Sequence, residues 1–138
     1  LGATAEVLDL KPALSLKSTL VQVRKLPCGS NVGYNFTHRL DGDCRVGTVS
    51  IGYADGLPLA LSNRGEVVVR GRRCRILGRI SMDYVNIDLN GVPDAEPGDE
   101  VICQGDGIAI ADWADAKQTH PHEVLCSLGH RLVRRYVP

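Results

Sequence analysis

The sequence predicts a mainly β fold, a small β-barrel-like domain with two short helices near the C-terminus. Three observations lead to this prediction. Short runs rich in β-branched residues recur along the chain with Gly, Pro, Asn and Asp between them, as in barrels built from short strands. Helical periodicity is confined to the residues after about 110. The 138 residues, of which 43% are hydrophobic, are enough for one domain, residues 1–138, with its own core.

The first part of the chain is expected to form two strands that pair as a hairpin. Val21 and Val23 alternate with polar residues, which predicts a half-buried strand over 19–26 after an irregular entry segment at 10–18. A turn signal at 41–43 places the next strand at 45–53. Between the two strands, a glycine at position 33 indicates a close backbone approach or a positive φ.

Three further strand regions follow. Residues 66–70 and 74–77 flank Gly71 as a second hairpin, and residues 99–104 form a later strand. Alternation is clearest over 84–89, where it predicts that three apolar side chains face inward. They are Val85, Ile87 and Leu89.

The end of the chain is expected to hold two helices and a last strand. Trp113 follows Ile110 at helical spacing in the helix predicted at 111–117, and Asp112 lies near its start, where a carboxylate suits the helix dipole. A second helix is predicted at 121–128, with Pro121 in its first turn, an apolar stripe and Gly129 after its end. The stripe comprises Val124, Leu125 and Leu128. Residues 131–137 are predicted to return as a final strand.

Charge and cysteine content exclude several classes of function. Sixteen basic residues balance sixteen acidic ones, so no overall field favours nucleic acid or an anionic membrane. The local arginines alternate with apolar residues, which indicates a solvated strand face; they are Arg70, Arg72, Arg73, Arg75, Arg131, Arg134 and Arg135. No apolar run approaches the roughly 20 residues of a membrane helix. Five scattered cysteines favour reduced thiols in the cytoplasm and no metal site.

The most chemically suggestive side chains all allow a structural interpretation. Tyr53 ends a β-branched run and Tyr34 follows a glycine, but tyrosines at such places most often pack with their hydroxyls satisfied. A phenol with a pKa of about 10 also needs a neighbouring cation or donor before it transfers protons near neutral pH. Met82 and Asp83 read by default as a core methionine and a turn aspartate.

Five motifs, taken in their order and spacing, resemble the C-terminal domain of alanine racemase. They are residues 10–17 (LKPALSLK), 32–34 (VGY), 47–56 (GTVSIGYADG), 60–65 (ALSNRG) and 78–83 (GRISMD). The resemblance extends to the Asp112-Trp113-Ala114 segment and to residues 122–124, and so covers nearly the whole chain. It implies a racemase that interconverts L- and D-alanine with pyridoxal 5′-phosphate.

Proteins of this family have two domains, and the resemblance concerns only the second. It implies an N-terminal (β/α)8 barrel that binds the cofactor through a lysine, and a homodimer in which the C-terminal domain of one subunit completes the active site of the other. The four lysines of this chain match no Schiff-base motif, and Leu1 is not an initiator methionine. We therefore expect a piece of a longer protein that is inactive when isolated.

The resemblance also assigns roles to individual residues. Tyr34 matches the catalytic tyrosine, one of two bases on opposite faces of the substrate α-carbon. Tyr53 matches a tyrosine of the substrate entryway that hydrogen-bonds near cofactor and substrate, and Met82 matches the residue whose backbone N–H meets the substrate carboxylate. Arg79 and Asp83 match polar residues of the outer entryway.

Two positions differ from the family pattern and support alternatives. His122 stands where a tyrosine usually contacts the cofactor phosphate region, and Leu59 stands where many members carry arginine. Histidine still donates a hydrogen bond, so His122 is a candidate cofactor-binding residue. Both changes leave open a serine or broad-specificity racemase. A different class of function, a standalone association domain without catalysis, also remains open, and the reading frame upstream of Leu1 would separate it from an enzyme.

Overall fold

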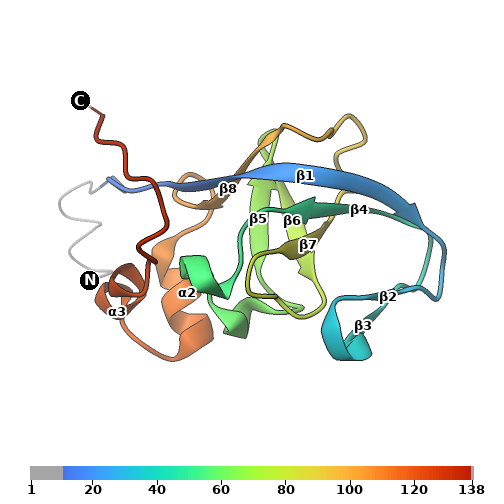
Figure 1. Ribbon diagram of the computed structural model, residues 1–138, viewed down its shortest axis with the longest axis horizontal. Coiled ribbons are helices and arrows are strands. Elements are labelled where there is room, and N and C mark those ends of the chain that lie inside the picture. Colours follow the sequence, from blue (N-terminus) through green and yellow to red (C-terminus); the bar gives the residue numbers. More distant parts are fainter. Residues whose placement is uncertain (1–10, 138) are drawn as a thin grey trace.

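The computed structural model describes residues 11–137 of the chain, so Leu10 and its part of the first motif lie outside the described residues. Six strands close into a barrel in the order β1-β4-β7-β6-β5-β8, and all neighbours are antiparallel (Figure 1). The mainly β prediction is confirmed. The barrel strands are β1 (Leu16–Leu26), β4 (Cys44–Val49), β5 (Glu66–Val69), β6 (Arg72–Leu77), β7 (Val85–Asp88) and β8 (Glu100–Gln104).

Smaller elements lie at the two ends of the barrel. The strands β2 (Asn31–Val32) and β3 (His38–Arg39) form a two-stranded sheet, and the 3-10 helix η1 (Tyr34–Phe36) connects them. This sheet lies at the opposite end of the molecule from the C-terminal helices (Figure 1). The remaining elements are η2 (Tyr53–Asp55), η3 (Leu59–Leu61), α2 (Ile110–Lys117) and α3 (Pro121–Cys126). None of the helices within residues 11–137 is long and apolar enough to cross a bilayer.

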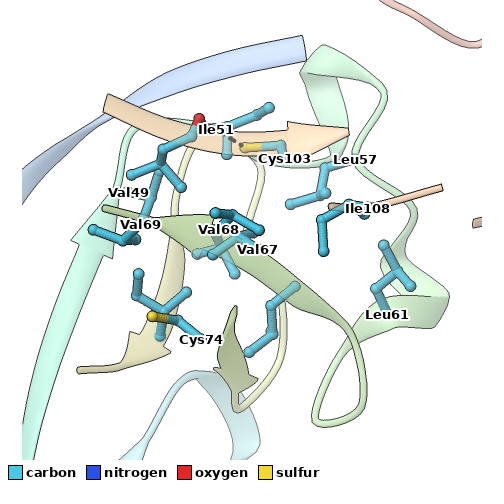
Figure 2. Packing of buried hydrophobic residues seen from close by; sticks show 14 of the residues in the cluster. Val49, Ile51, Leu57, Leu61, Val67, Val68, Val69, Cys74, Cys103 and Ile108 are labelled. Carbon is cyan, nitrogen blue, oxygen red and sulfur yellow. Dashed lines mark hydrogen bonds between the residues drawn. The ribbon is translucent and has the colours of Figure 1, made fainter. Parts of the chain in front are cut away.

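A continuous apolar core fills the barrel. Side chains from β4, β5, β6 and β8 meet there with those of the loop after β4, as Figure 2 shows for Val49, Val67, Cys74, Cys103 and Leu57. The inward orientation predicted for the apolar residues of β7 is confirmed, because Val85 and Ile87 are buried, as is Leu89 just after the strand. A second cluster anchors the β2–β3 sheet; it comprises Val32, Leu40, Cys44, Val46 and Leu77.

The half-buried pattern predicted for the first strand is confirmed at Val23, which packs against the core, but is wrong at Val21. Leu20 is fully buried, whereas Val21 is 45% exposed. The register with β4 shifts between Leu20 and Gln22, a β-bulge that moves the following residues by one position. Val21 lies in this bulge, so its side chain leaves the core face, whereas Val23 beyond the bulge packs against the core.

Three predicted elements need correction. The strand expected at 45–53 ends at Val49, because the Tyr53 N–H donates to the Ser81 carbonyl and not to a strand partner. No strand forms at 131–137; its first residue, Arg131, is instead engaged in ion pairs. The stripe of the last helix is narrower than expected, because Val124 is buried but Leu125 is 39% exposed.

Candidate functional site

The segment at 78–83 contacts the two loops that carry Tyr34 and Tyr53. It connects β6 to β7, and its backbone contacts the loop before η1 and the turn of η2. Residues 32–34 and 52–54 come from distant parts of the sequence, yet both contact the backbone of residues 78–83. The backbones of the three motifs are therefore joined through residues 78–83 rather than lying as three separate loop ends.

The loop that carries Tyr34 is pressed against the start of this segment. Gly33 has a φ of 78°, and a Cβ added to it would lie 2.8 Å from the Arg79 backbone nitrogen. Any side chain at position 33 would thus meet backbone while adopting a left-handed conformation. Asn35 and Phe36 also have positive φ values, of 59° and 52°. The sequence-based expectation of a close approach at Gly33 is confirmed, and the loop projects Tyr34 outward.

Asn63 ties the same loop to the segment from a third direction. Its side-chain oxygen accepts a hydrogen bond from the Gly78 N–H at 2.7 Å, and its amide nitrogen donates to the Thr37 hydroxyl at 3.2 Å. Its backbone N–H donates to the Gly78 carbonyl at 3.2 Å. One asparagine therefore links η3, the start of 78–83 and the residue that ends the Tyr34 turn.

The turn that carries Tyr53 is fixed to the other end of the segment. The Tyr53 N–H donates to the Ser81 carbonyl at 3.0 Å, and the Ala54 N–H donates to the Met82 carbonyl at 3.1 Å. A Cβ on Gly52 would lie 2.2 Å from the Met82 carbonyl oxygen, so only glycine permits this approach. Tyr53 and Met82 are thereby held side by side through their backbones.

The candidate groups face outward and are not used by the fold. Tyr34, Tyr53 and Met82 are 65%, 46% and 52% exposed. Within residues 11–137, neither phenol hydroxyl takes part in a hydrogen bond, and the Met82 N–H donates to no acceptor. The interpretations of packed tyrosines and a core methionine are therefore wrong here. The surface offers two phenols and a free amide N–H, groups that can bind a carboxylate and exchange protons.

Arg131 joins Asp55, in the turn of Tyr53, to Asp83, the residue after Met82. Its guanidinium donates to both oxygens of Asp55, at 2.6 and 3.1 Å, and to Asp83 at 2.7 Å. Burial raises the pKa of the Asp55 carboxyl, but hydrogen bonds from Arg131 and from the Gly52 N–H outweigh it and hold that pKa below its usual value. Sequence reasoning missed this arginine, because its alternation with apolar neighbours indicated a solvated strand.

The remaining predicted residues are less closely tied to this surface. Arg79 follows Gly78 in the central segment, and its side chain is exposed. His122 is exposed on α3, and none of the hydrogen bonds or ion pairs within the described range connects it to Tyr34, Tyr53 or Met82. Leu59, in η3, is 39% exposed.

The chain provides few groups for holding a metal or forming a covalent bond with a cofactor. The portion that the structure describes contains no group of three His, Cys, Asp or Glu side chains placed to bind a metal ion. Its five cysteines are free thiols. Lys17 is paired with Glu100 and Lys117 with Glu123, at 2.9 and 2.8 Å. Two of the four lysines are thus held in ion pairs, and the surface around Tyr53 contributes hydrogen-bonding groups.

Comparisons with known proteins agree with this geometry. Residues 13–136 match the family model "Alanine racemase, C-terminal domain". Alanine racemase from Thiobacillus denitrificans is 43% identical over 128 residues, which are 93% of this chain and 35% of that protein. The one from Halothermothrix orenii is 38% identical over 133 residues, 94% of this chain and 35% of that protein. The chain thus spans about a third of the length of these relatives.

Solved structures give the same result. The biosynthetic alanine racemase of Pseudomonas aeruginosa superposes with a TM-score of 0.90 and 40% identity, over 97% of this chain and 37% of that one. An alanine racemase from Bartonella henselae with covalently bound pyridoxal phosphate gives a TM-score of 0.85 and 35% identity, over 89% and 34% of the two chains. The family model, the relatives and the solved structures agree, and the chain therefore belongs to the alanine racemase family, as its C-terminal domain.

Proposed function

We propose that this chain is the part of a pyridoxal-phosphate-dependent alanine racemase that supplies a catalytic tyrosine, Tyr34, to the active site of a partner subunit. The observation that carries the proposal is the convergence of the Tyr34 loop and the Tyr53 turn on residues 78–83. Family membership supports the reaction class, and the exposed, unbonded groups of this surface support their availability to a substrate.

Racemisation needs two proton-transfer groups on opposite faces of the α-carbon. Tyr34 is well suited to be one of them, because its side chain projects from a loop whose backbone is fixed by Gly33 and Asn63. Bound pyridoxal phosphate withdraws electrons from the α-carbon and so makes its proton acidic. The opposite base is assigned to the cofactor-binding lysine of the N-terminal barrel, outside this chain.

The neighbouring groups have binding and positioning roles. The Met82 N–H donates to the substrate carboxylate, since it has no acceptor within residues 11–137. Tyr53 lies beside it and hydrogen-bonds near the cofactor and substrate, while Arg79 and Asp83 line the outer entryway. His122, exposed on α3, would donate a hydrogen bond from its imidazole to the phosphate region of the cofactor.

An exposed apolar surface around the site supports assembly with another subunit. Six large side chains of the site loops are at least 39% exposed: Tyr34, Phe36, Tyr53, Leu59, Met82 and Tyr84. Large apolar side chains exposed on loops are the kind of surface that an interface with another protein covers. In the proposed homodimer, the (β/α)8 barrel of the partner subunit covers it and brings the lysine to Tyr34. The isolated domain, without that lysine, is inactive. Five free thiols favour the cytoplasm as its compartment.

Removal of the Tyr34 hydroxyl tests the assignment. In the full-length enzyme, Tyr34→Phe is expected to abolish α-proton abstraction from one enantiomer of alanine far more than from the other, because each base serves one face. The measurement is exchange of the α-hydrogen with deuterated solvent, starting from pure L- or D-alanine. Tyr136→Phe, which changes a phenol that is 93% exposed near the C-terminus, is the matched control. Equal, wild-type exchange from both enantiomers would remove Tyr34 as a base.

A serine or broad-specificity racemase is a second candidate, and two positions favour it. His122 and Leu59 replace a tyrosine and an arginine of the family pattern, and both side chains are exposed. The same exchange measurement with L- and D-serine separates the two candidates. A clear preference for serine over alanine would displace alanine as the substrate while leaving Tyr34 as the base.

A further inference from the structure

The Tyr53 turn and the Met82 segment are joined by one side chain that belongs to neither. Arg131 lies after α3, 76 residues from Asp55 and 48 residues from Asp83, and its Nη2 donates to both carboxylates. The same nitrogen lies 3.4 Å from the Met82 carbonyl oxygen. The guanidinium thus spans the two backbones that present Tyr53 and the Met82 N–H.

The Asp55 end of this bridge is firmly held. Asp55 is only 8% exposed, and its carboxylate also accepts a hydrogen bond from the Gly52 N–H at 2.9 Å. Its backbone carbonyl accepts from the Gly129 N–H at 3.1 Å, which fixes the chain leading to Arg131 against the same turn. The first contact of the guanidinium is therefore a fork on a buried carboxylate, a geometry that lysine cannot reproduce.

The Asp83 end is more open and makes a connection between loops. The side chains of Asp83 and Arg131 are 49% and 48% exposed, so their ion pair adds little to stability by itself. Its effect is geometric, since Asp83 directly follows Met82 in the chain. Without the bridge, only two backbone hydrogen bonds would tie residues 81–84 to the Tyr53 turn, those from Tyr53 to Ser81 and from Ala54 to Met82.

We propose that Arg131 is a positioning residue for substrate binding, which sets the separation between Tyr53 and the Met82 N–H by clamping Asp55 to Asp83. The proposal rests on the proposed function of this site. Arg131 acts through the two carboxylates and need not touch the substrate. A small displacement of a contacting group from its productive position can cost a large factor in rate, so the clamp affects turnover beyond its effect on folding.

The test uses the full-length enzyme with Arg131→Met, Arg131→Lys and Asp83→Asn, and with Arg134→Met as the matched control. Arg134 is exposed and contacts only backbone carbonyls of its own segment. Arg131→Met is expected to raise KM for alanine more than it lowers kcat, with a loss of up to about 100-fold in kcat/KM. Arg131→Lys should recover part of this loss, and Arg134→Met should keep the wild-type kcat/KM.

Two further measurements separate a positioning role from a structural one. In a double-mutant cycle, adding Asp83→Asn to Arg131→Met should change KM little further, because both remove the same link. Hydrogen–deuterium exchange should rise in the peptides covering 52–57 and 81–84 of Arg131→Met, with no rise at β5 and β6. Wild-type KM together with unchanged exchange in these peptides would overturn the proposal, as would a uniform rise in exchange across the barrel.

The failure of this inference can be told from the failure of the proposed function. If the wild-type enzyme does not racemise alanine, the proposed function fails. In that case the exchange measurement still decides whether Arg131 clamps the two loops. If the wild type is active and the Arg131 variants keep its kinetic constants, only the positioning role fails.

Discussion

Three thiols of the barrel wall show how burial changes the chemistry of single residues. Cys103 is fully buried in β8, and burial raises the pKa of its thiol to about 12. Burial, together with the charge of Asp88, raises the pKa of Cys44 to about 12 and that of Cys74 to about 11. These thiols stay protonated and unreactive near neutral pH.

The raised thiol pKa values predict a loss of stability in alkali. A cysteine in the unfolded chain ionises near pH 9.0, whereas the pKa of Cys103 in the folded chain is about 12. The stabilising contribution is thus complete below pH 9 and is lost as the pH rises towards 12, by up to about 1.4 kcal/mol per pH unit for each thiol. Urea unfolding between about pH 8 and 10.5 should show a shallower decline for Cys103→Ala than for the wild type. Val101→Ala, which removes a buried apolar side chain of β8 but no ionisable group, should keep the wild-type slope. Equal slopes in all three would contradict this account.

The residues of the site differed in how well the sequence could indicate them. Tyr34, Tyr53 and Met82 could be assigned roles because ordered motifs carry the family resemblance, although local patterns favoured packing for all three. Arg131 could not be recognised, because its partners are Asp55 and Asp83, and sequence distances of 76 and 48 residues leave no local pattern. Ion pairs between remote loops depend on the fold and cannot be derived from spacing.

At the scale of elements, the Tyr34 loop depends on the contacts of Asn63, a residue with an unusual backbone conformation. Asn63 adopts a left-handed backbone with a φ of 63°, which asparagine and glycine tolerate better than other residues. Its side chain satisfies the Gly78 N–H and reaches Thr37, so one residue determines how the β2–β3 excursion sits on the segment at 78–83. The orientation of Tyr34 should follow from this contact.

Replacement of Asn63 by glycine isolates the side-chain contribution, because glycine keeps the left-handed backbone. Asn63→Gly is expected to cost about 1–3 kcal/mol of unfolding free energy, since it leaves the buried Gly78 N–H without a partner. It should also lower kcat through a looser Tyr34, and hydrogen–deuterium exchange should increase over residues 33–38. Asn90→Gly, in the loop after β7, is the control: it removes another side-chain acceptor of a backbone N–H, that of Arg45, and should leave kcat unchanged. A variant with normal kcat and unchanged exchange at 33–38 would show that the Asn63 side chain does not hold the Tyr34 loop.

The strands were easier to predict than the places where they end. Alternation and turn residues located β5 to β8 and both helices to within a few residues. The end of β4 could not be foreseen, because Tyr53 leaves the strand direction to donate its N–H to Ser81, a residue of another loop. The bulge at Leu20 and Gln22 and the absence of a strand at 131–137 have the same origin in contacts distant along the sequence.

At the scale of the whole molecule, the barrel supports loops whose large side chains remain exposed. Its core is continuous and its six strands close on themselves, so that each barrel strand of the described chain is paired on both sides. Six large side chains of the site loops nevertheless remain exposed, and this chain spans about 35% of the length of its relatives. The missing surface, in the proposed assembly, is the barrel domain of a partner subunit.

Complementation between two inactive variants tests this central claim most directly. One full-length subunit carries Tyr34→Phe, and the other carries a substitution of the barrel lysine. If Tyr34 serves the partner's site, each mixed dimer contains one site with both bases intact, and mixing after dissociation should restore racemisation of alanine. If Tyr34 serves the site of its own subunit, every site lacks one base. No recovery of activity, in mixtures shown by mass spectrometry to contain mixed dimers, would contradict the account.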